Sequence, residues 1–251
     1  MDFLKSSKLA SRFEYVDQTG STNTDLVNSA SSNPKDFLHL SVLVAGSQTA
    51  GRGRTGRVWV SPAGKSLSIS VLVRPSGWSA KDFGWLPLLA GVAMREAVQA
   101  ALPNHSVGLK WPNDVQVNDK KISGILSELL PGATGVVIGA GVNLTLTQDE
   151  LPIVESTSLL LEGSEISPDE FLCSYIQNLS DLMKDFDQVP SLVRTACSTI
   201  SKSVRAIFPD GTEATGLAIG IDESGRLLIQ VAGTEQLLAV SAADIQHLRH
   251  N

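Results

Sequence analysis

Short apolar runs separated by polar turns dominate the first 145 residues. In residues 66–73 every second side chain is Leu, Ile or Val and most of the others are Ser, the alternation typical of a strand with one buried face. Five further runs are apolar and of strand length. The predicted strands are residues 40–45, 66–73, 106–111, 114–117, 122–129 and 135–143. A polar turn at residues 118–120 makes two of them a predicted hairpin.

Helical periodicity marks the segments that lie between and after these strands. Residues 85–102 place leucines and alanines on one face, which predicts a helix. The sequence Ser-Pro-Asp-Glu at residues 167–170 combines a capping box with proline at the first helical position, so a second helix should begin there. Its apolar stripe continues to Phe186. Pro190 is expected to end it, before a short helix over residues 191–200.

The pattern changes after residue 202. Three turn signals separate runs of Val, Ile and Leu, at residues 209–211, 223–225 and 232–234. Closely spaced turns between such runs are typical of a small antiparallel barrel. We therefore expect an α+β domain over residues 1–202, with a mixed sheet flanked by helices, and a small β domain over residues 203–251.

Charge is distributed unevenly along the chain. The 251 residues include 20 basic and 26 acidic side chains, a net charge of −6. An acidic protein is a poor candidate for general nucleic-acid binding, because phosphate contacts need cations. Residues 37–81, however, carry six basic and no acidic side chains, or +6, which leaves −12 for the rest. An isolated cationic stretch in an acidic protein indicates an anionic ligand.

The cysteines and the apolar stretches indicate the compartment. Cys173 and Cys197 are too few for a disulfide framework or a thiolate zinc site, so we expect free core thiols in a reducing environment. The first ten residues contain three charged side chains and no signal-peptide pattern. Apolar stretches are shorter than the ~20 residues that a membrane helix needs. A cytoplasmic protein without membrane association is expected.

A Gly-rich loop, residues 51–57, reads Gly-Arg-Gly-Arg-Thr-Gly-Arg. Its glycines satisfy the dinucleotide-binding spacing G-x-G-x-x-G, but neither a helix pattern nor a suitably placed acidic residue follows. A partial match to the protein kinase pattern lacks the catalytic loop. Glycines allow close backbone approach, and three arginines supply charge-assisted donors for phosphate or carboxylate. From composition alone, a mobile basic surface loop is the alternative.

A second motif, Lys-Trp-Pro-Asn-Asp, ends at Asp114. Pro112 should end the preceding strand and present Asn113 and Asp114 at a corner, with Lys110 just before them. Lys121 opens the return strand. A lysine at the start of a strand is usually solvated, but beside a second cationic loop it could hold an anionic group.

Taken together, these segments resemble the biotin–protein ligases. The family's marks are a Ser-Thr-Asn opening, a Gln followed by GRGRxGRxW, then KWPND, K-x-x-GIL-x-E and G-x-G-[VI]-N. They stand here, in the family's order, at residues 21–23, 48, 51–59, 110–114, 121–128 and 139–143. The small C-terminal β domain also looks like the family's SH3-like barrel.

The resemblance implies a fold and an activity. The fold would be the biotin/lipoate ligase fold, which is similar to class II aminoacyl-tRNA synthetase cores, with a C-terminal SH3-like barrel. The activity would be that of an ATP-dependent ligase. Biotin and ATP would form biotinyl-5′-adenylate, with Mg²⁺ neutralising the pyrophosphate. The biotinyl group would then pass to one lysine of the biotin carboxyl carrier domain of a carboxylase.

Site residues follow from the same resemblance, position by position. Catalytic roles fall to Lys121, Arg52 and Arg54. The residues that would surround biotin are Ser21, Thr22, Asn23, Gln48, Arg52, Gly53, Arg54 and Lys121. The residues that would frame ATP or the adenylate are Arg54, Thr55, Gly56, Arg57, Trp59, Lys110, Asn113, Asp114 and Asn143. Mg²⁺ is expected to have few protein ligands of its own, and the sequence does not identify them. The loop is expected to order over the adenylate and exclude water.

The sequence departs from the family pattern at two places, and two alternative functions are considered. Thr55 stands where relatives often have an arginine-like residue, so weaker adenylate retention is expected. About a dozen residues precede the strand-like residues 13–17, too few for a winged helix, which predicts the ligase-only type without a DNA-binding domain. The family includes monomers and homodimers, and either is expected. The alternatives are a lipoate–protein ligase and a catalytically inactive sensor of biotin or biotinyl-adenylate.

Overall fold

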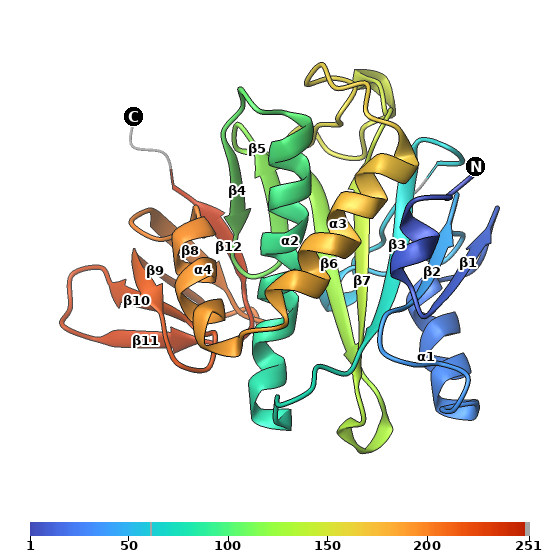
Figure 1. Ribbon diagram of the computed structural model, residues 1–251. Coiled ribbons are helices and arrows are strands. Elements are labelled where there is room, and N and C mark those ends of the chain that lie inside the picture. The colour runs from blue at the N-terminus through green and yellow to red at the C-terminus, as the bar shows by residue number, and fades with distance from the viewer. Residues whose placement is uncertain (61, 249–251) are drawn as a thin grey trace.

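A seven-stranded mixed sheet forms the centre of the computed structural model, which describes residues 1–60 and 62–248 (Figure 1). Its strands in spatial order are β1 (Arg12–Val16), β2 (Ser41–Ala45), β3 (Ser66–Val73), β7 (Val136–Asn143), β6 (Lys120–Leu129), β5 (Asp114–Val117) and β4 (Val107–Lys110). β1 and β2 pair in parallel and the other neighbours pair antiparallel. The predicted strands and hairpin are confirmed. The turn is tighter than predicted, because Asn118 and Asp119 adopt positive φ and β6 begins at Lys120.

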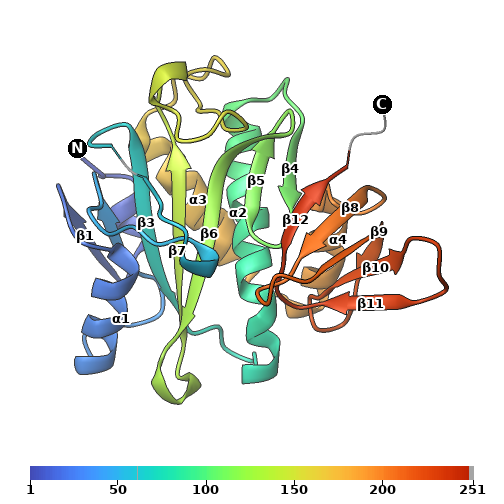
Figure 2. The ribbon, with the colours of Figure 1, turned by 180° about the vertical axis from the view of Figure 1, so that it is seen from behind.

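Helices cover the two faces of the sheet unequally (Figures 1 and 2). On one face α2 (Leu86–Ala101) packs on β4, β5 and β6, and α3 (Pro168–Leu182) packs along α2. On the opposite face α1 (Thr22–Ser32) packs on β3 and β7. Figure 2 shows the segment between β2 and β3 crossing in front of β6 and β7 on this second face, beside α1.

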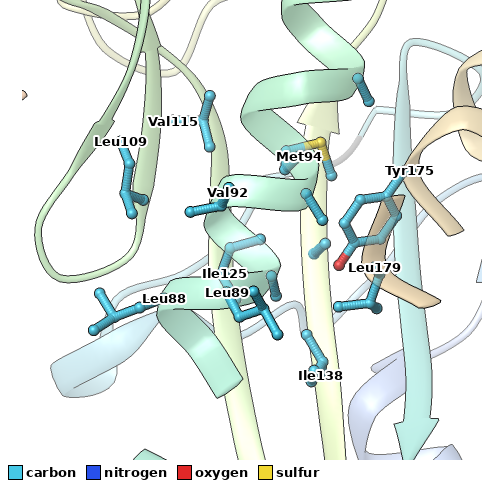
Figure 3. Close-up of a cluster of buried hydrophobic side chains, with 14 of the residues drawn as sticks. Leu88, Leu89, Val92, Met94, Leu109, Val115, Ile125, Ile138, Tyr175 and Leu179 are labelled. Atoms are coloured by element: carbon cyan, nitrogen blue, oxygen red, sulfur yellow. The ribbon is translucent and has the colours of Figure 1, made fainter. Parts of the chain in front are cut away.

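The hydrophobic core lies between the sheet and the α2–α3 layer. Figure 3 shows side chains of α2 meeting those of β4 to β7 and of α3: Leu88, Leu89, Val92, Met94, Leu109, Val115, Ile125, Ile138, Tyr175 and Leu179. The alternation predicted in β3 is confirmed, because Leu67, Ile69, Val71 and Val73 belong to this core. The serines of β3 consequently face the other side of the sheet.

The C-terminal part forms a five-stranded antiparallel sheet. Its strands are β8 (Ser203–Ile207), β9 (Glu213–Ile221), β10 (Leu227–Val231), β11 (Leu237–Val240) and β12 (Asp244–His247), in the order β11-β10-β9-β8-β12. Gly211, Gly225 and Gly233 adopt positive φ at the three predicted turns, as such turns require. Trp111 Nε1 donates to Gly225 O (3.1 Å) and Trp85 Nε1 donates to Glu223 O (3.1 Å), so this sheet is hydrogen-bonded to the larger part of the chain.

The end of α3 differs from the prediction. The helix begins at the predicted capping box but ends at Leu182, because the Asp185 side chain accepts a hydrogen bond from the backbone of Asp187 and begins a new turn. Phe186 still packs on Trp78, with ring centroids 4.7 Å apart, so its apolar character reflects burial and not helix continuity.

Pro190 was expected to end that helix, and this prediction is wrong. It lies in the first turn of α4 (Val189–Ala196), where its missing N–H costs no hydrogen bond. The short helix predicted over residues 191–200 exists, but it begins and ends earlier. The described residues also contain six 3-10 helices: Ser6–Leu9, Arg54–Gly56, Ala80–Trp85, Pro131–Ala133, Gln148–Glu150 and Phe186–Gln188.

Both cysteines are free thiols, but only Cys197 is buried. Cys173 is half-buried, which corrects the expectation of two core thiols. Its position on α3 near the charged Asp169 and Lys5 gives the physical reason, since those groups lie at the solvent-facing edge of the helix layer. Across the described ranges, no helix is both long enough and apolar enough to cross a membrane.

Candidate functional site

A cavity of about 340 Å³ opens on the face of the sheet that α2 and α3 leave free. Its walls come from the start of α1, the loop between β2 and β3, the corner between β4 and β5, strands β6 and β7, residues 152–156 and strand β12. The site residues proposed from the sequence that line it are Ser21, Thr22, Asn23, Gln48, Arg52, Gly53, Arg54, Thr55, Arg57, Trp59, Lys110, Asn113, Asp114, Lys121 and Asn143. Gly56 does not line it. The segments singled out in the sequence therefore meet in space.

Two glycines of β7 form part of the cavity floor. A Cβ atom added at Gly139 would lie 2.4 Å from Asn23 Oδ1, and one added at Gly141 would lie 2.2 Å from Trp59 Cε2. The Asn23 carboxamide and the Trp59 indole therefore rest directly on the strand backbone. This close approach is the physical reason for glycine at both positions.

A hydrogen-bonded group of polar side chains surrounds the end of the cavity next to α1. Gln48 Oε1 accepts from the backbone N–H of Thr22 (2.9 Å) and lies 3.2 Å from Thr22 Oγ1. Ser70 Oγ lies 2.8 Å from Thr22 Oγ1 and donates to Asn23 Oδ1 at 2.6 Å. Ser21 is the N-cap of α1 beside them. This end offers neutral donors and acceptors.

Two ion pairs lie on the other side of the cavity. Lys121 Nζ is 2.6 Å from Asp114 Oδ1. Arg57 Nη2 is 2.5 Å from Asp244 Oδ2, which links the Gly-rich loop to β12 of the C-terminal sheet. The carboxylates of Asp114 and Asp244 thus partner two cations of this wall.

Two further cations of this wall are largely removed from water. Burial lowers the pKa of Lys110 and of Arg54, and the nearby carboxylates of Asp114 and Asp244 oppose each shift. A desolvated cation is stabilised by any anion brought next to it. The geometry therefore favours a strongly anionic ligand, as the isolated cationic stretch of the sequence predicts.

The Gly-rich loop is closed by its own backbone. Gly53 N–H donates to Arg57 O (2.7 Å) and Trp59 N–H donates to Gly51 O (2.9 Å). Thr55 and Gly56 turn the chain with φ of 52° and 76°. Between β2 and β3 the described residues form this 3-10 turn and not an α-helix, so the glycines are not followed by the helix that a dinucleotide-binding loop needs.

The asparagines at the corner and at the end of β7 hold the walls of the cavity. Asn113 Nδ2 donates to Ile125 O (2.8 Å), and Asn113 Oδ1 accepts from Arg54 Nη1 (3.3 Å). Asn143 Nδ2 donates to Thr157 O (2.9 Å). Both side chains reach the cavity while fixing a neighbouring segment.

Comparison with known proteins decides the family. Residues 15–143 match the biotin/lipoate A/B protein ligase family, and residues 199–248 match the biotin protein ligase C terminal domain. The biotin--[acetyl-CoA-carboxylase] ligase of Mycobacterium tuberculosis is 37% identical over 251 aligned positions, which cover 95% of this chain and 90% of that protein. The chain belongs to the biotin/lipoate A/B protein ligase family.

Other members of the family show how far the similarity extends. The bifunctional ligase/repressor BirA of Escherichia coli is 35% identical over 201 positions, covering 76% of this chain and 61% of that protein. The chain therefore aligns with less than two thirds of the repressor's length. A biotin protein ligase from Aquifex aeolicus, solved in complex with biotin and ATP, superposes with a TM-score of 0.78 and 25% identity, covering 95% of this chain and 100% of that one. The predicted fold class, a mixed sheet with flanking helices and a C-terminal SH3-like unit, is confirmed.

Three residues that line the cavity or hold its lining side chains have no role in the sequence-based prediction. Ser70 is one of several serines in β3, and the sequence does not distinguish it from the others. The side of the sheet that it faces is known only once the strand is placed in the sheet. Glu128 closes a family motif but was given no function. Asp244 lies 187 positions from its partner Arg57, in a segment without a recognisable pattern, so only the fold reveals it.

Proposed function

We propose that the chain is a biotin–protein ligase, which activates biotin with ATP and transfers it to a lysine of a biotin carboxyl carrier domain. The observation that carries the proposal is the meeting of the arginine-rich loop, the 110–114 corner and Lys121 around one cavity. The similarity to a biotin--[acetyl-CoA-carboxylase] ligase, at 37% identity over 95% of the chain, supports the same substrate and the same kind of acceptor.

The two ends of the cavity suit the two ends of biotin. The neutral end formed by Ser21, Thr22, Asn23 and Gln48 would surround the ureido and thiophane rings, which need hydrogen bonds without charge. Arg52, Gly53, Arg54 and Lys121 would surround the carboxylate. The adenylate would lie against Arg54, Thr55, Arg57, Trp59, Lys110, Asn113, Asp114 and Asn143, with Gly56 shaping the loop.

The reaction uses these cations for charge stabilisation. A carboxylate oxygen of biotin forms a bond to the α-phosphorus of ATP, and the bond to the bridging oxygen breaks, releasing pyrophosphate. Arg52, Arg54 and Lys121 reduce the repulsion between the two anions and stabilise the charge of the transition state. The acceptor amine then attacks the biotinyl carbonyl, AMP leaves with the bonding electrons, and the amine proton passes to solvent.

Mg²⁺ fits this site as a companion of ATP. Within the described residues, no group of three or more His, Cys, Asp or Glu side chains could hold a metal. The carboxylates that line the cavity, Asp114 and Asp244, are each ion-paired. We therefore propose that Asp114 or Asp244 would help to hold the ion beside ATP, where it would neutralise the charge of the pyrophosphate.

The domain organisation is part of the proposal. Residues 1–202 would form the catalytic domain and residues 203–251 the C-terminal SH3-like domain, although residues 249–251 lie outside the described residues. The loop over residues 51–59 would order further over the adenylate and protect the mixed anhydride from water. A reducing, cytoplasmic location agrees with the free thiols of Cys173 and Cys197.

One experiment tests the function. The protein is incubated with ATP, Mg²⁺, a biotin carboxyl carrier domain and either biotin or lipoate, and the intact carrier is analysed by mass spectrometry. Biotinylation of the target lysine, lost with EDTA and absent for a carrier whose target lysine is replaced by arginine, is the expected result. Lipoylation without biotinylation would make the chain a lipoate ligase. Binding of biotin without transfer would make it a sensor.

A further inference from the structure

An ion pair ties the start of the Gly-rich loop to the body of the protein. Arg52 Nη2 lies 2.8 and 3.0 Å from the two carboxylate oxygens of Glu128 in β6, and 2.9 Å from Thr24 Oγ1 in α1. Within the described residues, the side-chain hydrogen bonds of Arg52 all run through Nη2. The remaining N–H groups of the guanidinium, on Nη1 and Nε, are therefore left for a ligand.

Glu128 is itself held in place by Asn23. Asn23 Nδ2 donates to Glu128 Oε1 (3.0 Å) and to Leu126 O (3.0 Å), while Asn23 Oδ1 accepts from Ser70 Oγ (2.6 Å). Asn23 is only 5% exposed and both of its N–H donors are used. Its carboxamide thus holds the wall of the cavity together, and it has no free N–H to offer a ligand.

We propose that Glu128, held by Asn23, is a positioning residue that fixes Arg52 for the carboxylate of biotin. This inference rests on the proposed function. Because Asn23 is joined through Ser70 to Thr22, and Thr22 to Gln48, the neutral end of the cavity and the first arginine of the loop belong to one hydrogen-bonded framework. That framework sets the distance between the ring end and the carboxylate end of the ligand.

The physical benefit is pre-organisation. Arg52 is 49% exposed in its side chain, and a long side chain without a partner loses rotamer entropy when it binds a ligand. Glu128 uses one edge of the guanidinium and so removes that freedom before biotin arrives. The Glu128 carboxylate also offsets the positive charge of Arg52. Its contribution to biotin binding therefore comes from orienting Arg52 and not from added attraction.

Steady-state kinetics separate positioning from general stability. For adenylate formation, Glu128→Ala should raise the KM for biotin about 10-fold and leave the KM for ATP within about 2-fold, since only the carboxylate end loses its fixed partner. Glu128→Gln, which keeps an acceptor for Asn23, should raise the KM for biotin about 3-fold. The matched control is Glu213→Ala, which breaks the exposed Arg205–Glu213 pair (2.6 Å) of the C-terminal sheet and should change neither constant.

Two results would overturn the inference. The first is an unchanged KM for biotin in Glu128→Ala. The second is a further rise in the KM for biotin when Glu128→Ala is added to Arg52→Ala. A residue that acts through Arg52 should have no effect on this KM once Arg52 has been replaced.

Trypsin cleavage of the ligand-free protein after Arg52 tests the tether without any catalysis. Glu128→Ala should be cleaved there several-fold faster than the wild type. Equal cleavage rates would overturn the inference whether or not the protein is active. A wild type that forms no biotinyl-adenylate, but whose cleavage responds to Glu128→Ala, would instead refute the proposed function alone.

Discussion

The indole of Trp59 rests on the backbone of Gly141. An added Cβ at position 141 would lie 2.2 Å from Trp59 Cε2 and 2.7 Å from Trp59 Nε1, so a side chain cannot occupy this position unless the indole moves. Trp59 follows the arginine-rich loop in the sequence, and Gly141 lies in the middle of the central sheet. The contact fixes the end of the loop against the floor of the cavity.

Gly141→Ala should therefore impair catalysis more than folding. Displacing Trp59 by about 1 Å or more should lower kcat/KM for adenylate formation at least ~10-fold, because catalysis depends on placement at that scale. Gly220→Ala in β9 is the matched control, since the added methyl would meet nothing within 4 Å. Equal activity of the two variants in an adenylate assay would contradict the role given to the contact.

Lys121 carries the sharpest prediction about the chemistry. Its ammonium is 2.6 Å from Asp114 and within the cavity, where it would face the carboxylate and the α-phosphate. Lys121→Ala should reduce the rate of adenylate formation ~10²-fold or more, the usual effect of removing a charge-stabilising donor. Lys120→Ala, one residue earlier and exposed, should leave the rate unchanged. Full activity of Lys121→Ala in single-turnover kinetics would refute its assigned role.

Lys110 should show opposite effects on stability and on activity. Burial lowers its pKa, so the folded protein holds a partly desolvated ammonium whose cost the carboxylates of Asp114 and Asp244 offset only in part. Lys110→Met should keep or raise the Tm by a few degrees, on the order of 1–4 °C, while raising the KM for ATP at least ~10-fold. Thermal unfolding and ATP titration measure both. A fall in Tm with an unchanged KM would be the contrary outcome.

The lowered pKa of His247 predicts how the stability of the folded protein depends on pH. Burial, followed by the nearby Lys202 and Lys110, lowers its pKa from the ordinary 6.5 to about 4. Nε2 lies 3.1 Å from Thr199 Oγ1, and the folded state favours the neutral ring. The stabilisation is complete above pH 6.5 and is lost as the pH falls from 6.5 towards 4, because the unfolded chain takes up the proton first.

Replacing His247 should flatten that dependence. Because the ring is partly exposed, the contribution between pH 7.5 and 4.5 should be about 1 kcal/mol after screening by solvent. Urea denaturation of the wild type and of His247→Gln at both pH values measures it. An identical loss of unfolding free energy in the two proteins would show that His247 does not contribute.

Local patterns predict most of the elements, because strands and helices are set by nearby residues. The alternation of β3 and the capping box at Ser167 both correspond to observed structure. The error at Pro190 has a local cause too, since proline ends one helix or opens the next depending on where the chain already turned. Phe186 shows that an apolar stripe reports burial and not the continuation of a helix.

The site was predictable only as far as its residues lie in recognisable segments. The glycines of β7 belong to such a segment, but their partners Asn23 and Trp59 are distant in sequence, so the reason for glycine appears only in the fold. Asp244 has no local signal, and it reaches the cavity because β12 is placed beside the Gly-rich loop. Asn23 lines the cavity, and its bonds to Glu128 and Ser70 also give it a supporting role that the sequence does not reveal.

Formation of the mixed anhydride in the absence of any acceptor is the most direct test of the central claim. The protein is mixed with biotin, ATP and Mg²⁺, denatured at intervals, and the released small molecules are analysed by mass spectrometry. We predict biotinyl-5′-adenylate in an amount close to that of the protein, accompanied by pyrophosphate and strongly reduced in Lys121→Ala. Recovery of unreacted biotin and ATP from a folded, biotin-bound protein would contradict the claim.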